Sequence, residues 1–342
     1  MDSNFILVAL IIAVALAFDY INGFHDAANS IATVVATRVL SPRHAVIWAG
    51  FWNLCAVFVL DTGVASTVGK GMVDLKIVTP YVILAGLLGA IVWDLLTWWW
   101  GLPTSSSHAL LGGYGGAAMA KVALTQGVWR IFDALVISGW LKMIAFIIIA
   151  PMLGMTLAYL LMVAVHWIFR STMPNKVDRW FRWMQLASSA VFSFAHGSND
   201  AQKTMGIITS VLITGGYLET FIVPKPVIWA AYIAIAAGTM SGGWRIVRTM
   251  GARLTRLKPR GGFCAETAAA ISILFPTYLH MPVSTTHVIA GSIAGVGSVH
   301  RLKAVRWGLA TNILWAWLFT IPATAAVGAF CMLLIKVLVG KT

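Results

Sequence analysis

The stretch NGFHDAAN at residues 22–29 places one acid, one histidine and two asparagines inside a run that is mainly apolar. A related stretch, HGSNDAQK, occupies residues 196–203, and Asp200 follows Asp26 at an interval of 174 residues. An ionisable side chain inside an apolar run is costly to bury, and by default it marks a functional position. The chain therefore carries one polar pattern twice, once in each half.

A second pair of motifs follows in the same order. PTSSSH at residues 103–108 is echoed by PVSTTH at residues 282–287, an interval of 179 residues. Two motif pairs in the same order, at nearly equal intervals, indicate an internal duplication. Two glycines after each of these motifs recur at the same interval. They are Gly112 and Gly116 after PTSSSH, and Gly291 and Gly295 after PVSTTH.

The composition excludes several classes of protein. Of 342 residues, 59% are apolar and only 10% are charged, whereas an ordinary soluble domain has roughly 25% charged residues. So few charges could not cover the surface of a soluble enzyme of this length. The net charge of +13 comes from Lys and Arg in short loops between apolar runs. That placement is typical of membrane topology signals and not of nucleic-acid binding.

The apolar runs are long enough to cross a membrane as helices. A crossing needs about 20 apolar residues, and the sequence offers about ten candidate spans, about five on each side of a polar loop. We therefore predict an all-α polytopic membrane protein. Residues 1–169 form the first repeat, residues 170–183 a cytoplasmic linker and residues 184–342 the second repeat.

An odd number of spans in each half places the two copies in opposite orientations. Inverted repeats of about five spans each, with broken or re-entrant helices that meet inside the membrane, are a transporter architecture. The Gly-rich stretches 104–120 and 284–299 are short for full spans and are predicted to be re-entrant. Fifteen Lys and Arg residues fall in loops on one predicted side and seven on the other. The richer side is predicted to be cytoplasmic, so both termini are predicted to lie outside.

Each hydroxyl motif is predicted to open a helix. Proline suits the first helical turn, and the hydroxyls and free N–H groups that follow form an anion site favoured by the helix dipole. Two such helix ends converging from opposite sides would surround a tetrahedral oxyanion with donors. The alternative is that these hydroxyls cap the helix or bond to its carbonyls. The predicted anion site comprises Ser105, Ser106, Ser107, Ser284, Thr285, Thr286, Asn22 and Asn199.

Two acids are predicted to bind the coupling cation. Asp26 has no basic neighbour in sequence except His25, so it is predicted to bind a proton or another cation. Asp200 is followed one helical turn later by Lys203. This spacing leaves two alternatives, a functional carboxylate or a fixed ion pair with Lys203 as charge partner. Asn29 is grouped with the acids as an oxygen ligand, although such an asparagine could also only link helices.

Glu266 is the third acid assigned to the coupling cation. It stands at the head of an apolar run, and the two glycines before it also permit a position in the aqueous interface. Asp94 is predicted to be peripheral. No metal ligand is predicted, because His108 and His287 are single histidines without a second ligand at zinc spacing. They are expected to form hydrogen bonds.

A hydrolase and an anion channel are the alternatives from other functional classes. A hydrolase would use Ser106 or Ser107 with His108 and Asp26, but neighbouring side chains on one helix point apart. The sequence also lacks the G-x-S-x-G nucleophile motif. We therefore predict no catalytic residue and no enzyme. A channel also uses oriented donors, but it cannot drive uphill uptake.

These motifs resemble those of a known family. The sequence resembles the inorganic phosphate transporter (PiT) family, especially its bacterial low-affinity members, over nearly the whole chain. Residues 22–29 and 196–203 resemble its paired signature, and residues 103–108 and 282–287 its paired hydroxyl motifs. The resemblance implies symport of inorganic phosphate with a cation, alternating access, a homodimer and a bacterial plasma membrane. No cofactor and no nucleic-acid partner are expected.

Two departures from the family pattern bear on the coupling ion. Sodium-coupled members tend to carry Asn-Asp followed three residues later by Asn in both repeats. Here His25 precedes Asp26, and Lys203 stands in place of the second Asn. A lysine ammonium can occupy the space of a bound cation, so the sequence favours H⁺ over Na⁺. Bacterial relatives are also thought to carry neutral metal–phosphate complexes, which makes a divalent metal a further candidate passenger.

The alternative substrate within the same fold is sulfate, thiosulfate or a related oxyanion. Phosphate near neutral pH usually carries a proton that it can donate to a carboxylate. Sulfate has only acceptors, and an ionised aspartate repels it. Acids inside the membrane therefore favour phosphate, provided that they line the anion site.

Overall fold

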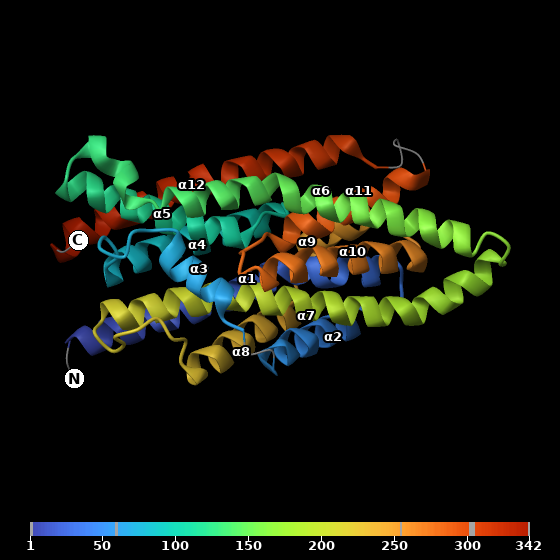
Figure 1. Cartoon of the computed structure of the whole chain (residues 1–342), viewed down its shortest axis with the longest axis horizontal. Helices are drawn as coiled ribbons and strands as arrows, with labels where there is room; N and C mark the ends of the chain where they lie inside the picture. Colours follow the sequence, from blue (N-terminus) through green and yellow to red (C-terminus); the bar gives the residue numbers. More distant parts are fainter. Residues whose placement is uncertain (1–2, 59–60, 254, 301–304, 341–342) are drawn as a thin grey trace.

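Long helices that run along the longest axis of the molecule make up most of the fold (Figure 1). The computed structural model describes residues 3–58, 61–253, 255–300 and 305–340, and within these ranges it contains helices and loops but no strand. The longer helices are α1 (Ser3–Ala36), α2 (Pro42–Cys55), α3 (Gly63–Gly71), α4 (Pro80–Trp100), α5 (Ser106–Thr125), α6 (Ile137–Ile168), α7 (Pro174–Thr214), α8 (Lys225–Ser241), α10 (Pro259–Tyr278), α11 (Thr285–His300) and α12 (Trp307–Val339). The prediction of an all-α membrane protein is confirmed.

Hydropathy distinguishes two groups among these helices. Within the described ranges, four helices are long and apolar enough to cross a membrane: α1, α4, α6 and α12. Two bent pairs, α2 with α3 and α8 with the short helix α9 (Trp244–Val247), raise the number to six if each pair is one span. The other long helices are α5, α7, α10 and α11, and the repeated motifs lie on α1, on α7 and at the starts of α5 and α11. About five spans in each half therefore stays a prediction.

The two helices that carry the repeated polar stretches, α1 and α7, lie side by side and antiparallel. Asn4 Nδ2, near the start of α1, donates to Gly215 O, just after α7, at 2.9 Å. Thr37 Oγ1, just after α1, donates to Gln185 Oε1, near the start of α7, at 2.9 Å. Both helices are continuous through their polar stretches. The antiparallel course is the one that inverted copies require, and the inverted-repeat relationship of the whole halves stays a prediction.

The stretches predicted to be re-entrant form the second helices of two hairpins, α4–α5 and α10–α11. In Figure 1 the α4–α5 hairpin lies in the half of the molecule that contains both termini, whereas α10 and α11 lie mainly in the other half. Each hairpin begins at a proline, Pro80 or Pro259, whose fixed φ suits the first turn. Gly101 ends α4 with a left-handed φ of 68°, which glycine adopts without a steric cost.

The repeated glycines allow each hairpin to pack against a long helix of the other half. A methyl group on Gly116 of α5 would overlap the backbone of Ala325 in α12, and one on Gly295 of α11 would overlap that of Met155 in α6. Gly112 contacts α12 and Gly291 contacts α6 in the same way. Small residues at such contacts let membrane helices approach closely. Each half therefore supports the hairpin of the other.

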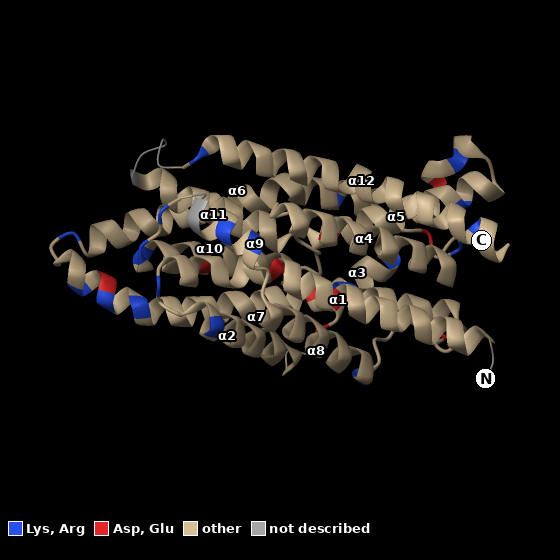
Figure 2. Cartoon of the chain, turned by 180° about the vertical axis from the view of Figure 1, so that it is seen from behind, with Lys and Arg blue, Asp and Glu red and all other residues tan. Residues whose placement is uncertain are grey.

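The segment predicted as a linker, residues 170–183, is mostly helical. α6 ends at Ile168 and α7 begins at Pro174, so only residues 169–173 form the turn. α7 starts before the apolar run does, because the polar residues after Pro174 continue the same helix. Figure 2 shows Lys and Arg around this turn, at the end of the molecule opposite to both termini. The side of the membrane on which the termini lie, and the division into repeats, stay predictions.

Candidate functional site

The tips of the two hairpins meet in the interior. The rings of His108 and His287, each near the start of the second helix of its hairpin, have centroids 4.8 Å apart. Ser105 Oγ accepts from His108 N and Ser284 Oγ accepts from His287 N, both at 3.3 Å. The first serine of each motif thus has the capping role that the sequence left open. Its hydroxyl proton can still be donated to a ligand.

All residues predicted for the anion and cation sites are buried, and none is more than 5% exposed. They come from α1, α7, α10 and the starts of α5 and α11. The contacts among them show which ones the fold brings together, and they form two centres around Asp200 and Asp26.

Lys203 joins the second polar stretch to the first hydroxyl motif. Its Nζ donates to Asp200 Oδ1 and to Ser107 Oγ, both at 2.5 Å, and to Val283 O at 2.8 Å. These acceptors use all three protons of the ammonium group. Thr285 Oγ1 donates to the second oxygen of Asp200 at 3.4 Å. The structure therefore contains the ion pair that was one alternative for Asp200, and the same lysine fixes Ser107.

Asp26 is surrounded by hydroxyl and imidazole groups. His25 Nδ1 lies 2.8 Å from Asp26 Oδ1. Ser106 Oγ donates to that oxygen at 3.4 Å, and Thr286 Oγ1 donates to Asp26 Oδ2 at 3.3 Å. Asn29 Nδ2 in turn donates to Thr286 Oγ1 at 2.9 Å. One hydroxyl from each motif reaches Asp26, so this acid lies between the two helix ends.

Asp26, Asp200 and His196 form a buried cluster that could hold a cation. Each offers one ligand atom, and these atoms lie within 4.8 Å of one another. His196 Nε2 lies 3.3 Å from Asp200 Oδ2. Carboxylate oxygens suit hard cations, and an imidazole nitrogen extends the range to transition metals. The sequence pattern did not single out His196 as a ligand.

Of the two asparagines predicted for the anion site, Asn199 binds other groups of the protein in this structure. Asn199 Nδ2 donates to Thr277 Oγ1 at 2.7 Å and to Met281 O at 3.3 Å, and its Oδ1 accepts from Val283 N at 3.3 Å. It therefore holds the loop between α10 and α11. Asn22 is buried on α1, one helical turn before Asp26 on the same face.

Glu266 is fully buried, so the aqueous-interface alternative is wrong for this acid. Thr33 Oγ1 and Gln185 Nε2 donate to Glu266 Oε1 at 2.6 and 2.9 Å, and Ser188 Oγ donates to Oε2 at 2.5 Å. Thr33 lies two helical turns beyond Asp26 on α1, a rise of about 10 Å. The fold therefore places Glu266 apart from the other predicted cation ligands, in a network that joins α1, α7 and α10.

The prediction that Asp94 is peripheral is wrong. Asp94 lies on α4 with no exposed surface, and it interacts electrostatically with His25 and Asp26. A single acid in an apolar run has no periodic neighbour that reveals which way it points. The packing of α4 against α1 decides its position.

Polar residues at helical spacing mark the faces of α1 and α7 that line the site. Intervals of three and four residues place side chains on one face of a helix. This spacing would have identified Asp19, which is fully buried, and His196 from the sequence. The α1 set is Asp19, Asn22, Asp26, Asn29 and Thr33, and the α7 set is Ser189, Ser193, His196, Asp200 and Lys203.

Each hairpin loop is held by a threonine from one of the bent helix pairs. Thr67 of α3 donates to His280 O at 2.7 Å. Thr249, in the π-helical segment η3 (Arg248–Arg253) that follows α9, donates to Gly101 O at 2.9 Å. His280 and Gly101 both have left-handed φ values, 59° and 68°. The two loops are thus fixed by corresponding contacts.

Comparisons with known proteins agree on one family. A sequence profile described as "Phosphate transporter family" matches residues 22–328. A Rhizobium meliloti protein named "Probable low-affinity inorganic phosphate transporter" is 51% identical over 328 residues, which cover 96% of each chain. A Bacillus subtilis protein of the same name is 42% identical over 346 residues, covering 99% of this chain and 100% of that one. A solved structure named "The sodium-dependent phosphate transporter" has a TM-score of 0.84 at 22% identity and covers 97% of this chain and 99% of its own. This last likeness shows a shared fold.

Proposed function

Because the chain belongs to the phosphate transporter family, we propose that it is a secondary active symporter of inorganic phosphate. In this proposal a proton moves with the phosphate, and access to the site alternates between the two sides of the membrane. The family transports its substrate and does not transform it, so the hydrolase alternative is set aside. The observation that carries the proposal is that two hydroxyl motifs meet at a buried cluster of two carboxylates and one ammonium.

The hydroxyl motifs supply the anion side of the site. Ser106 and Ser107 lie at the start of α5, and Thr285 and Thr286 at the start of α11. Transporters commonly direct the N-termini of broken or re-entrant helices at the charged group of an anionic substrate. Their hydroxyl protons and free backbone N–H groups are suitable donors to the oxygens of a phosphate.

The charges of the site support the proposal that a cation accompanies phosphate. When both acids are ionised, the buried group of Asp26, Asp200 and Lys203 has one more negative charge than positive. An anion that enters such a buried site adds further negative charge, which is costly away from water. A proton on Asp26, or another cation beside it, removes that cost. Binding of phosphate and binding of the cation therefore favour each other.

A proton fits the site better than sodium. The ammonium of Lys203 already neutralises Asp200 at 2.5 Å. Asp26 has His25 Nδ1 at 2.8 Å, and the other nitrogen of that ring lies 3.1 Å from Thr97 Oγ1. An imidazole is suited to deliver or accept a proton near neutral pH. A second candidate passenger is a divalent metal bound with phosphate, which the cluster of Asp26, His196 and Asp200 supports.

Phosphate is favoured over sulfate by the carboxylates among the hydroxyls. Asp26 contacts one hydroxyl of each motif, Ser106 and Thr286. A phosphate that carries a proton can donate to such a carboxylate, whereas sulfate offers only acceptors. We further propose the bacterial plasma membrane as the location, with both termini outside, and a homodimer as the assembly.

Uptake into proteoliposomes tests this proposal. With the inside alkaline, labelled phosphate should accumulate above its external concentration, and a protonophore should abolish the accumulation. Unlabelled phosphate should compete, and sulfate at the same concentration should not. A sodium gradient without a pH gradient serves as the control for sodium coupling. Uptake that follows the sodium gradient and ignores the protonophore would contradict proton coupling, and equilibration without accumulation would indicate a channel.

A further inference from the structure

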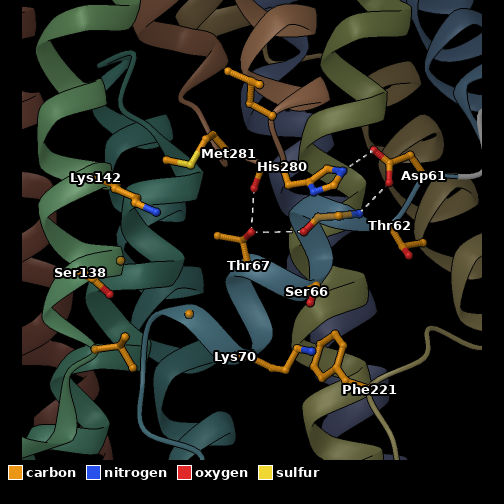
Figure 3. Close-up of a pocket in the computed structure, with 15 residues that line it drawn as sticks. Asp61, Thr62, Ser66, Thr67, Lys70, Ser138, Lys142, Phe221, His280 and Met281 are labelled. Carbon is orange, nitrogen blue, oxygen red and sulfur yellow. Dashed lines mark hydrogen bonds and ion pairs between the residues drawn. The ribbon is translucent and has the colours of Figure 1, made fainter.

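Two basic cavities flank the hairpin tips, one beside each loop. The lysine cavity, of about 660 Å³, lies between α3, α6 and the α10–α11 loop (Figure 3). Its polar lining includes Asp61, Thr62, Ser66, Lys70, Lys142 and His280. The arginine cavity, of about 420 Å³, lies beside the α4–α5 loop, and its lining includes Trp100, Gly101, Arg245, Arg248 and Thr249.

Positive charge in the lysine cavity is available to an anion. Lys142 is the single Lys or Arg of the 32-residue helix α6, and Figure 3 shows its side chain directed into the space between α6 and α3. Lys70 Nζ lies 5.1 Å from the ring centroid of Phe221. The acid of the lining, Asp61, is already engaged by His280 Nε2 at 3.5 Å. A charged residue in a membrane-spanning helix usually faces a partner or a water-filled cavity.

One loop separates the lysine cavity from the buried site. His280 and Met281 line the cavity, while Val283, two residues further, accepts from Lys203 Nζ at 2.8 Å. Asn199 holds the same loop through Met281 O at 3.3 Å. A movement of this short segment would therefore connect the cavity with the ammonium and hydroxyls of the site.

The arginine cavity has the corresponding position at the other hairpin. Gly101 lines it, and the loop continues from Gly101 to Ser105, the cap of α5. Arg245 is held in place, because its Nη1 donates to Trp99 O at 2.7 Å. Arg248 is exposed beside it. Thr249 donates to Gly101 O at the arginine cavity. This contact corresponds to the one at the lysine cavity, where Thr67 donates to His280 O.

We propose that the two cavities are the opposite ends of one anion path. Phosphate collects at Lys70 and Lys142 on one side of the membrane and at Arg248 on the other, before the adjoining loop admits it to the buried site. Positive charges outnumber negative ones in the lining of both cavities, and such an excess raises the local concentration of an anion and its association rate. This inference rests on the proposed function, and it adds the two capture sites and the loops that they serve.

The test measures initial rates of phosphate transport separately from each face, in right-side-out and inside-out membrane vesicles. The double variant Lys70→Gln/Lys142→Gln should raise the KM for phosphate about 3- to 10-fold from one face only, with an unchanged maximal rate. Arg248→Gln should do so from the opposite face only. Matched controls are Lys76→Gln and Arg179→Gln, which remove exposed charges outside both cavities. Lys70→Arg/Lys142→Arg should keep the wild-type KM.

The outcomes separate this inference from the proposed function. An equal rise of KM from both faces, or a rise no larger than in the matched controls, would overturn the inference while wild-type transport still supported the function. A reduced maximal rate with unchanged KM would also overturn it, because the lysines would then act on the loop movement and not on capture. Absence of phosphate transport by the wild-type protein would overturn both.

Discussion

Asn29 Nδ2 donates to Thr286 Oγ1 at 2.9 Å, and Thr286 Oγ1 donates onward to Asp26 Oδ2 at 3.3 Å. The polar stretch of the first half and the hydroxyl motif of the second are thus joined through one hydroxyl proton. A phosphate oxygen that accepts the hydrogen bond from this hydroxyl deprives Asp26 of a donor. A proton or cation at Asp26 would then be more favourable, and this is the route by which the proposed symport would couple the two ions.

Replacing Thr286 with Val removes the shared hydroxyl and nearly preserves the side-chain volume. Because phosphate can no longer alter the donors of Asp26 through this group, we expect the pH dependence of phosphate affinity to become shallower. Phosphate binding to the purified protein, measured by calorimetry at several pH values, tests this expectation. Thr311→Val, at an exposed turn of α12, is the control. A slope equal to that of the wild type would mean that coupling uses another route.

Ser106→Ala and Thr285→Ala each remove one hydroxyl donor from the start of a hairpin helix. A hydrogen bond to a charged ligand contributes about 1.5–3 kcal/mol, so phosphate affinity should fall at least about tenfold in each variant. Equilibrium binding of labelled phosphate gives the measurement. Ser298→Ala, near the far end of α11, should bind phosphate like the wild type. Unchanged affinity in both site variants would refute the anion-site assignment.

Asp26→Asn keeps the shape of the side chain and removes its ability to titrate. We expect phosphate accumulation driven by a pH gradient to be lost while exchange of internal for external phosphate continues, since exchange needs no net proton movement. Asp133→Asn, at an exposed ion pair, is the control. If Asp26→Asn still concentrates phosphate in response to the pH gradient, another residue carries the proton.

Lys203→Gln removes the ammonium partner of the buried Asp200, and breaking a buried ion pair costs on the order of 3–5 kcal/mol. The double variant Lys203→Gln/Asp200→Asn removes both charges, so it should be less harmful than Lys203→Gln alone. A double-mutant cycle in phosphate affinity and in thermal stability measures this interaction. Strictly additive effects of the two substitutions would contradict the ion-pair assignment and would favour a direct contact between Lys203 and phosphate.

Glu266→Gln weakens a network of three donors and leaves Asp26 untouched. We expect a lower midpoint of thermal unfolding in detergent, because each hydrogen bond to a charged group contributes about 1.5–3 kcal/mol. Accumulation driven by a pH gradient should persist. A variant of normal stability that has lost proton-driven accumulation would restore Glu266 to the coupling pathway that its sequence position first suggested.

The repeats in the sequence made the central geometry predictable. Paired motifs behind Pro103 and Pro282 predicted two convergent helix ends, and His108 and His287 now lie in ring contact. The pairing of Lys203 with Asp200 followed from helical spacing. These features depend on local sequence and on a duplication that can be read directly from the chain.

Other features depend on packing between distant segments. The positions of Asp94 and Glu266 are set by helices that contact α1 and α7, and no neighbouring residue in sequence reports that contact. The position of Lys142 could not be predicted, because a single charge in an apolar run does not show whether the side chain faces lipid or a cavity. The bends after α2 and α8 also escaped prediction, since hydropathy measures the length of an apolar run and not its direction.

The exchange of hairpins between the halves has a consequence for biosynthesis. α5 is supported by α12, which is translated after the other helices described above, through the contact of Gly116 with Ala325. The first half therefore depends on a later part of the chain for the support of its hairpin. A nascent chain that ends before α12 would hold α5 without its partner, exposed to lipid or to quality-control proteases. The hairpin of the first half therefore gains its full support only after α12 has been translated and has packed against α5.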